Sequence, residues 1–493
     1  MNKFFINKSI PYFCIFIKLM NKADFYQILS NKFSYEITDS QDLLLQKISD
    51  FIVERSETIF LLKGYAGTGK TTIISTLVQN LWQAKYKYTL LAPTGRAAKV
   101  ISSYAKYPAY TIHKHLYYPK TDSSGKLSFT LRKNKQRNTV FIVDEASMIS
   151  GNNKSDSLFD TVSLLSDLIE YVYSNTGNKL ILVGDTAQLP PVGMELSPAL
   201  DKEYLEYEYN HPVVEFELDE VVRQSLHSGI LFNATKIRDG IAEESTKDIK
   251  FNTQGFDDFI KLDNGYDIQD AIQEAYGGNI FEETAIVVRS NKRANLYNRQ
   301  IRNKILLKDN ELDVGDFLMV VKNNYFWIDK NSSAGFIANG DVIEILEIFK
   351  FIDLYGFRFA EVRVRMVDYP DEKPFETILL LDTLQSETPS LTYEESNKLY
   401  QAVNEDYAHL KTKWARYKKV KENKYFNALQ VKFAYAITCH KSQGGQWNNI
   451  FVEQPYMMSL ENKEEMRWLY TAFTRAQKKL YLIGFKNDFF IDD

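Results

Sequence analysis

The chain has very little cysteine, which excludes proteins built on disulfides or on cysteine-bound metals. Only Cys14 and Cys439 occur among its 493 residues. They are too few for a disulfide framework, and no paired C-x-x-C spacing is present for zinc or redox chemistry. This cysteine usage is typical of a reducing compartment, so we expect a cytoplasmic protein.

The chain also lacks a strong net charge of either sign. Its formal net charge is −4 at pH 7, although 25% of its residues are charged. A surface for nucleic acid must therefore come from local basic clusters and not from the field of the whole molecule. Residues 132–137 and 411–424 form two such clusters. The alternative is that each cluster is only a solvated face.

A segment that could cross a membrane is missing as well. Residues 1–19 are apolar, but they are too short to span a bilayer and are broken by Lys8, Pro11 and Lys18. They also lack a small-residue cleavage site, so they do not resemble a complete signal peptide. We expect no membrane association, and we interpret residues 1–19 as an extension before a translation start at Met20.

The most informative segment is Gly64–Thr71, which reads G-Y-A-G-T-G-K-T and follows an apolar run at residues 59–62. This spacing lets backbone N–H groups and a helix N-terminus face a triphosphate. Lys70 would reach the outer phosphates, and the Thr71 hydroxyl would meet Mg²⁺. The alternative is an accidental glycine-rich turn. The predicted nucleotide-binding residues here are Gly64, Tyr65, Ala66, Gly67, Thr68, Gly69, Lys70, Thr71 and Thr72.

Acidic residues follow two later apolar runs of the sequence. Asp144 and Glu145 come directly after residues 140–143, whereas Asp185 follows residues 180–183 and is itself followed by Gln188. At the ends of parallel strands, one carboxylate can hold magnesium and the next can activate water. The alternative is that these acids only cap turns or helices. Their order after the phosphate-binding segment favours nucleotide hydrolysis.

The pattern of apolar runs predicts an α/β protein with parallel sheets. Runs near residues 59–62, 89–92, 140–143 and 180–183 alternate with helical stretches, as in a sheet covered by helices on both faces. Residues 111–138 break this pattern and predict a hairpin-like insertion. A second alternating unit is expected to begin near Val213, and the length of the chain predicts about three to four domains.

This second unit is interrupted by a change of pattern. Residues 312–385 carry short alternating strands with turn residues between them, which predicts a small β-barrel. Residues 392–424 are helical in pattern and highly charged. The parallel sheet is expected to resume at residues 433–438.

The ordered motifs resemble those of superfamily 1 helicases, specifically the RecD-like and Dda-like 1B branch. In the first half they are Gln41, G-Y-A-G-T-G-K-T, A-P-T-G-R-A-A at 92–98, V-D-E-A at 143–146 and G-D-T-A-Q-L-P-P-V at 184–192. In the second half they are V-R-Q at 222–224, C-H-K-S-Q-G at 439–444 and Y-T-A-F-T-R-A at 470–476. The resemblance covers the chain from Met20 onward.

This resemblance implies two RecA-like P-loop NTPase domains. The first would span residues 20–210, with the hairpin insertion 1B at about 111–138. The second would comprise residues 211–311 and 425–493. Residues 312–424 would form insertion 2B, which contains an SH3-like β-barrel followed by a charged helical segment. Tyr118 or Phe129 in the hairpin is a candidate wedge for separating strands, although either aromatic could instead be packed.

The resemblance further implies an ATP-dependent DNA helicase that moves 5′ to 3′ on single-stranded DNA, uses ATP and Mg²⁺, and works as a monomer. Asp144 would hold the metal with Thr71, and Glu145 would act as base. The implied catalytic residues are Lys70, Asp144, Glu145, Gln188, Arg223 and Arg475. Gln41, Gln443 and Gly444 would contact the nucleotide, Gln41 by reading adenine. The implied DNA-binding residues are Thr94, His113, Lys114, Thr438, His440 and Ser442.

Other functions stay open on sequence alone. The same cleft could serve a regulatory ATP switch that never separates strands. It could also drive the motor subunit of a larger repair or nuclease complex, with replication or repair proteins as partners. RNA is a weaker candidate for the track, because no motif visibly tests for a 2′-hydroxyl.

Overall fold

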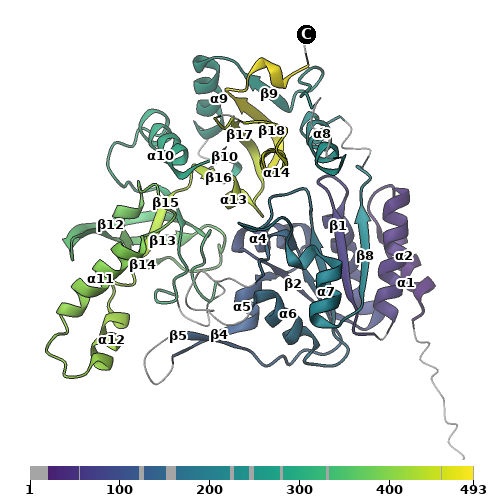
Figure 1. Ribbon diagram of the computed structural model, residues 1–493, viewed down its shortest axis with the longest axis horizontal. Coiled ribbons are helices and arrows are strands. Elements are labelled where there is room, and N and C mark those ends of the chain that lie inside the picture. Colours follow the sequence, from purple (N-terminus) through teal and green to yellow (C-terminus); the bar gives the residue numbers. More distant parts are fainter. Residues whose placement is uncertain are drawn as a thin grey trace, which may run out of the picture.

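The computed structural model describes residues 20–54, 56–121, 127–151, 163–222, 227–243, 249–277, 281–328, 332, 334–456 and 458–491. Within these residues the strands form two parallel sheets, a closed five-stranded barrel and a two-stranded hairpin (Figure 1). Helices lie against the sheets. This arrangement confirms the predicted fold class.

The first sheet places the phosphate-binding segment and the acidic residues at one edge. Its strand order is β3-β2-β6-β7-β1-β8, and every pairing is parallel. All residues of β6 and β7 are buried, which explains their continuous apolar sequence. The strands are β1 Ile59–Gly64, β2 Lys87–Ala92, β3 Ala109–Thr111, β6 Thr139–Val143, β7 Lys179–Gly184 and β8 Val213–Leu218.

Helices cover both faces of the first sheet, and each face has its own apolar core. Phe60 and Leu62 pack with residues of α1, α2 and α3, whereas Leu61 and Phe141 pack on the other face with residues of α6. The sheet and its helices are called the first lobe below. The helices are α1 Lys22–Lys32, α2 Asp39–Val53, α3 Lys70–Asn80, α4 Gly95–Ala105, α5 Ile112–Leu116, α6 Leu164–Tyr173 and α7 Lys202–Tyr209.

The strand that follows residue 212 does not begin a second unit as the sequence suggests. Val213–Leu218 forms β8, which pairs with β1 and completes the first sheet. A boundary at residue 210 would therefore separate β8 from its own sheet. The chain order could not reveal this, because strand partners are chosen by long-range packing and not by sequence neighbours. The other domain limits stay predictions.

The second sheet has the strand order β16-β10-β17-β18-β9 and is also parallel throughout. With its helices it is called the second lobe. The strands are β9 Phe259–Leu262, β10 Thr284–Val288, β16 Ala436–Thr438, β17 Trp447–Glu453 and β18 Ala476–Ile483. The helices are α8 Gly229–Glu243, α9 Gly265–Gly277, α10 Asn291–Gln300, α13 Cys439–Ser442 and α14 Lys463–Phe473.

The predicted barrel is present between α10 and β16. Its strands are β11 Phe317–Val320, β12 Val342–Leu354, β13 Phe357–Met366, β14 Phe375–Leu380 and β15 Leu429–Phe433. Helices α11 Tyr393–Glu405 and α12 Lys413–Glu422 pack on it through Leu399, Val403 and Val420. The sequence did not reveal β15, which returns to close the barrel just before β16 enters the second sheet.

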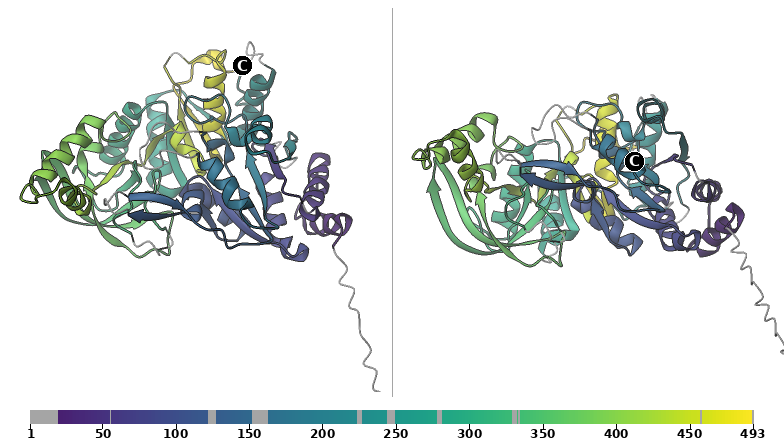
Figure 2. Two further views of the ribbon diagram at one scale, coloured as in Figure 1. Left: turned by 60° about the horizontal axis from the view of Figure 1, so that its bottom comes forward. Right: turned by 90° about the horizontal axis from the view of Figure 1, so that it is seen from below.

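The predicted hairpin is also present. Strands β4 Tyr117–Thr121 and β5 Leu127–Leu131 pair antiparallel, and the two views of Figure 2 show them extending from the first lobe on the side of the barrel. Tyr118 is 42% exposed, which leaves it accessible as a wedge. The side chain of Phe129 lies outside the described residues. Across the described parts of the chain, no helix is both long and apolar enough to traverse a bilayer.

Candidate nucleotide site between the two lobes

The phosphate-binding loop connects β1 to α3 and depends on two glycines. Gly67 and Gly69 have φ of +77° and +87°, a conformation that favours glycine. A Cβ at Gly69 would lie 2.5 Å from Gln41 Nε2, and one at Gly67 would lie 3.1 Å from Leu231. The loop is therefore closely enclosed as well as strained for any other residue.

The ammonium group of Lys70 lies against the first residues of this loop. Its Nζ donates hydrogen bonds to the carbonyl oxygens of Gly64 and Tyr65, both at 2.6 Å. These bonds hold the ammonium group at the start of the loop, where phosphate oxygens could replace the carbonyls as acceptors.

Gln41 supports the loop from α2. It is 2% exposed, and its Nε2 donates to Thr68 O at 3.0 Å. Its Oε1 accepts from Thr38 N at 3.2 Å within a capping box. Both ends of the amide thus have partners inside the chain, which gives Gln41 a structural role here. The contact with adenine stays a prediction.

Asp144 and Glu145 follow β6 beside the loop. Glu145 has φ of +54°, unusual for a residue with a side chain, and its N–H donates to Asp144 Oδ1 at 2.9 Å. Burial is the main cause that raises the pKa of Asp144 to about 7, and the charge of Glu145 acts in the same direction. The charges of Lys70 and Arg475 oppose this rise. Asp144 is therefore a half-buried carboxyl group that a bound cation would favour in its charged form.

A magnesium site fits these residues only as part of a nucleotide complex. Among the described residues, no group of three or more His, Cys, Asp or Glu could hold a metal ion. Mg²⁺ bound with a nucleotide needs fewer protein ligands, because phosphates and water supply the others. Asp144 and the hydroxyl of Thr71 at the start of α3 are suited to that role.

The segment after β7 connects the site to the second lobe. Asp185 is 2% exposed, and its Oδ1 accepts from Ala187 N at 3.0 Å. Farther along, Leu189 N donates to Thr471 Oγ1 at 2.8 Å, and Leu189 O accepts from Gln443 Nε2 at 2.7 Å. Gln188 lies inside this segment, 6% exposed, and its Oε1 has no hydrogen-bond partner among the residues that the structure describes.

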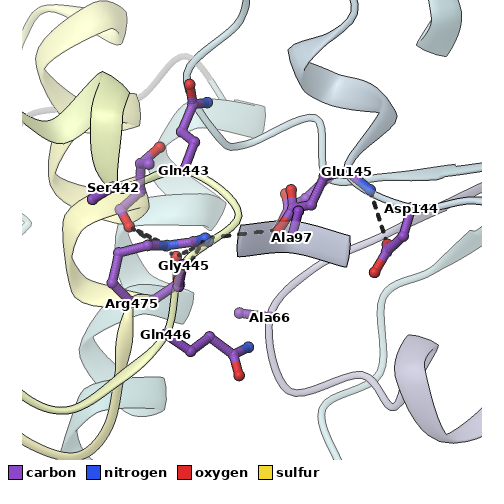
Figure 3. A network of polar contacts seen from close by, with 12 residues as sticks. Ala66, Ala97, Asp144, Glu145, Ser442, Gln443, Gly445, Gln446 and Arg475 are labelled. Atoms are coloured by element: carbon purple, nitrogen blue, oxygen red, sulfur yellow. Dashed lines mark hydrogen bonds and ion pairs between the residues drawn. The ribbon is translucent and has the colours of Figure 1, made fainter. Parts of the chain in front are cut away.

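Arg475 enters the site from the second lobe, directly after α14. It is 4% exposed, and Nη1 lies 3.7 Å from Glu145 Oε1 of the first lobe (Figure 3). Its Nε donates to Thr471 O at 3.0 Å, and Nη1 also donates to Gly445 O at 3.3 Å. Residues 330 positions apart in the sequence are thereby brought together where the two lobes meet. Arg223, the other arginine predicted for the site, lies outside the described residues.

The candidate DNA residues fall into two groups. Thr94 caps α4 by accepting from Ala97 N at 3.2 Å, and a Cβ at Gly444 would lie 3.3 Å from Thr94 Oγ1. Thr94 therefore abuts the C-H-K-S-Q-G segment, which also carries His440 and Ser442. Thr438 is the residue that precedes α13.

His113 and Lys114 form the second group, on α5. Burial lowers the pKa of His113 to about 4, so this imidazole is neutral near pH 7. Lys114 lies over the ring of Tyr110 at 5.4 Å, and Gly335 of the barrel insertion approaches its side chain. This group therefore lies where the first lobe meets the barrel.

Two residues of the site were not singled out by the sequence. Tyr470 lies in the Y-T-A-F-T-R-A motif, but no spacing rule assigns it a partner; its hydroxyl meets Ala66 and Asp185. Arg96 lies in the A-P-T-G-R motif, with its guanidinium 4.6 Å from the Trp447 ring of the second lobe. Their membership in motifs was the only available signal.

The start of α4 also meets two barrel carboxylates. Arg96 lies 3.9 Å from Asp368, and the buried Asp341 packs against Gly95. Burial, aided by the charge of Asp368, raises the pKa of Asp341 to about 8. The second lobe and the barrel thus both contact α4 of the first lobe.

This buried carboxyl predicts a pH-dependent stability. A raised native pKa means that Asp341 contributes stability at acidic pH and loses it as pH rises from about 4 to about 8. We expect Asp341→Asn to remove this dependence. From pH 5 to pH 8, the free energy of unfolding of wild type should therefore fall by at least about 1 kcal/mol relative to that of the variant. Chemical denaturation across this range measures the difference. Parallel curves for both proteins would contradict the assignment.

Comparisons with known proteins agree with the motifs in both halves. Residues 41–254 match an AAA domain family, and residues 433–483 match the UvrD-like helicase C-terminal domain. The chain is 25% identical to the uncharacterized protein R530 of Acanthamoeba polyphaga mimivirus, over 89% of this chain and 98% of that protein.

Two relatives with assigned names are also similar along most of the chain. The RecBCD enzyme subunit RecD of Buchnera aphidicola is 25% identical over 94% of this chain and 75% of its own length. The ATP-dependent DNA helicase dda of Enterobacteria phage T4 is 23% identical over 91% of this chain and 99% of its own length. With the ordered motifs and the two-lobed fold, these matches make the chain similar to the RecD-like and Dda-like helicases of superfamily 1B.

Proposed function

We propose that the protein is an ATP-dependent DNA helicase that moves 5′ to 3′ along single-stranded DNA and separates the duplex ahead of it. The proposal rests most on the approach of Arg475, from the second lobe, to Glu145, beside the phosphate-binding loop of the first. A site completed by both lobes responds to their relative motion, which is what a motor requires. We place this activity in the cytoplasm.

The residues divide the chemistry of ATP hydrolysis among them. The loop around Lys70 would hold the phosphates through backbone N–H groups and the ammonium charge. Asp144 and Thr71 would hold Mg²⁺, which supplies positive charge to the phosphates when bound. Glu145 would accept a proton from the attacking water, since its carboxylate lies next to Asp144 at the strand end.

Arg475 would act on the transferred phosphoryl group. Its guanidinium is held by the carbonyls of Thr471 and Gly445, so it is oriented before the reaction begins. Negative charge that develops on the phosphate would draw the Arg475 guanidinium away from Glu145. The Glu145 carboxylate would then be free to take a proton. Gln188 would respond to the presence of the phosphate, and the hydrogen bonds of Leu189 would transmit this response to the second lobe.

DNA is proposed to run along the edge where Thr94 and the C-H-K-S-Q-G segment abut. Thr94, Thr438 and Ser442 carry hydroxyls suited to phosphate oxygens, and such contacts are independent of base sequence. His113 is neutral at pH 7 and would therefore contact DNA only as a hydrogen-bonding group. The neighbouring helix α4 of the first lobe contacts the second lobe, so nucleotide-driven movement would reach the DNA strand there.

Strand displacement tests this function directly. Purified protein with ATP and Mg²⁺ should unwind a duplex that carries a 5′ single-stranded tail and leave a duplex with a 3′ tail intact. Labelled-strand release measures both, and a blunt duplex serves as the control. Activity from the 3′ tail alone would reject the proposed direction, and ATP turnover without strand release from either substrate would reject unwinding.

A further inference from the structure

Tyr470 makes hydrogen bonds across the cleft that the roles above leave unused. It lies on α14 of the second lobe and is 1% exposed. Its hydroxyl accepts from Ala66 N at 2.8 Å, a residue 404 positions away, and donates to Asp185 Oδ2 at 2.8 Å, a residue 285 positions away. One hydroxyl therefore joins the second lobe both to the phosphate-binding loop and to the end of β7.

These bonds are of a kind that is costly to lose. Tyr470 and Asp185 are buried and Ala66 is half-buried. A buried donor or acceptor left without its partner costs about 1–3 kcal/mol. The bond to Asp185 involves a carboxylate and is therefore stronger than one between neutral groups. Burial raises the pKa of Asp185, whereas the Tyr470 hydroxyl lowers it. The pair thus fixes the segment that leads to Gln188.

The same helix carries Arg475 into the site. Next to Tyr470, Thr471 accepts from Leu189 N through Oγ1 and from Arg475 Nε through its carbonyl oxygen. The docking of Tyr470 on Ala66 and the direction of the Arg475 guanidinium are therefore set by adjacent residues of one rigid segment. A shift of Tyr470 would displace Arg475 relative to Glu145.

We infer that Tyr470 is a positioning residue for ATP hydrolysis: its hydroxyl docks α14 on the phosphate-binding loop and so aims Arg475 at the reacting phosphate. This inference rests on the proposed function of the cleft. It assigns the effect to the hydroxyl and not to the ring, which phenylalanine would retain in the same space.

The test is Tyr470→Phe, measured as steady-state ATP turnover with single-stranded DNA. We expect kcat to fall about tenfold, because the Arg475 guanidinium is no longer aimed at the reacting phosphate. The KM for ATP should stay within about twofold, since the loop and Lys70 remain. Unchanged kcat would overturn the inference.

Combining this change with Arg475→Lys separates positioning from loss of stability. If Tyr470 acts through Arg475, Tyr470→Phe should change kcat less than about twofold in the Arg475→Lys background. A further tenfold loss in the double variant would overturn the inference, because independent effects multiply.

Tyr276→Phe is the matched control. Tyr276 is a buried tyrosine of the second lobe whose hydroxyl donates to Tyr435 O at 2.7 Å, among residues outside the proposed site. It should lower the thermal midpoint and leave kcat unchanged. A loss in kcat equal to that of Tyr470→Phe would overturn the inference. Because the readout is ATP turnover, it stays decisive even if the wild-type protein separates no strands and the proposed function fails.

Discussion

Lys70→Ala is expected to lower DNA-stimulated ATP turnover by about a thousandfold, the largest loss we foresee for a single residue. Lys70 supplies the one ammonium group inside the described phosphate-binding loop, where Nζ lies against the carbonyls of Gly64 and Tyr65. Alanine keeps the helix, because it is a strong helix former. Steady-state hydrolysis with single-stranded DNA measures the effect.

Lys63→Ala provides the control, from strand β1 that leads into the loop. Lys63 precedes the loop, but its Nζ pairs with Glu215 of β8 at 2.7 Å and not with the loop carbonyls. Its removal should leave kcat within about twofold, because its partner lies on β8 and not in the phosphate-binding loop. The thermal midpoints of both variants should stay near that of wild type. Full turnover by the Lys70 variant would refute the assigned role of the loop.

Glu145→Gln should separate nucleotide binding from hydrolysis. Glutamine has nearly the same shape but cannot accept a proton from water, so we expect hydrolysis to slow by about 10² to 10⁴-fold. ATP affinity should stay within a few-fold of wild type, because the phosphate-binding loop is unchanged. Single-turnover hydrolysis gives the rate, and titration with a fluorescent ATP analogue gives the affinity.

Glu217→Gln is the corresponding control. Glu217 is an exposed carboxylate of β8 that accepts from the Tyr65 hydroxyl, near the loop but away from Asp144. Its replacement should preserve the single-turnover rate. The role of Glu145 as base is wrong if its variant hydrolyses ATP at the wild-type rate, or if both glutamine variants slow equally.

The parts of the fold that could be predicted were those encoded over a few neighbouring residues. The phosphate-binding loop was visible because glycine is needed at Gly67 and Gly69, where φ is positive. The central strands β6 and β7 were visible because burial on both faces demands continuous apolar runs. By contrast, β8 and β15 were assigned to the wrong place or overlooked, since their partners lie far away in the chain.

The candidate site shows the same division. Asp144 and Glu145 could be proposed from their place after an apolar run, and Arg475 from its motif. The sequence offered no sign that the Tyr470 hydroxyl reaches Ala66, or that Arg96 stacks on Trp447.

The sequence by itself determined which chemical groups are available and in what order: a loop for phosphates, carboxylates at strand ends and an arginine late in the chain. Only the tertiary structure decided that Arg475 meets Glu145 and that the barrel and the second lobe both contact α4 of the first lobe. The physical reason is that local conformation follows from steric and hydrogen-bonding preferences of adjacent residues. Contacts between distant residues instead depend on packing energy that is shared by the whole core.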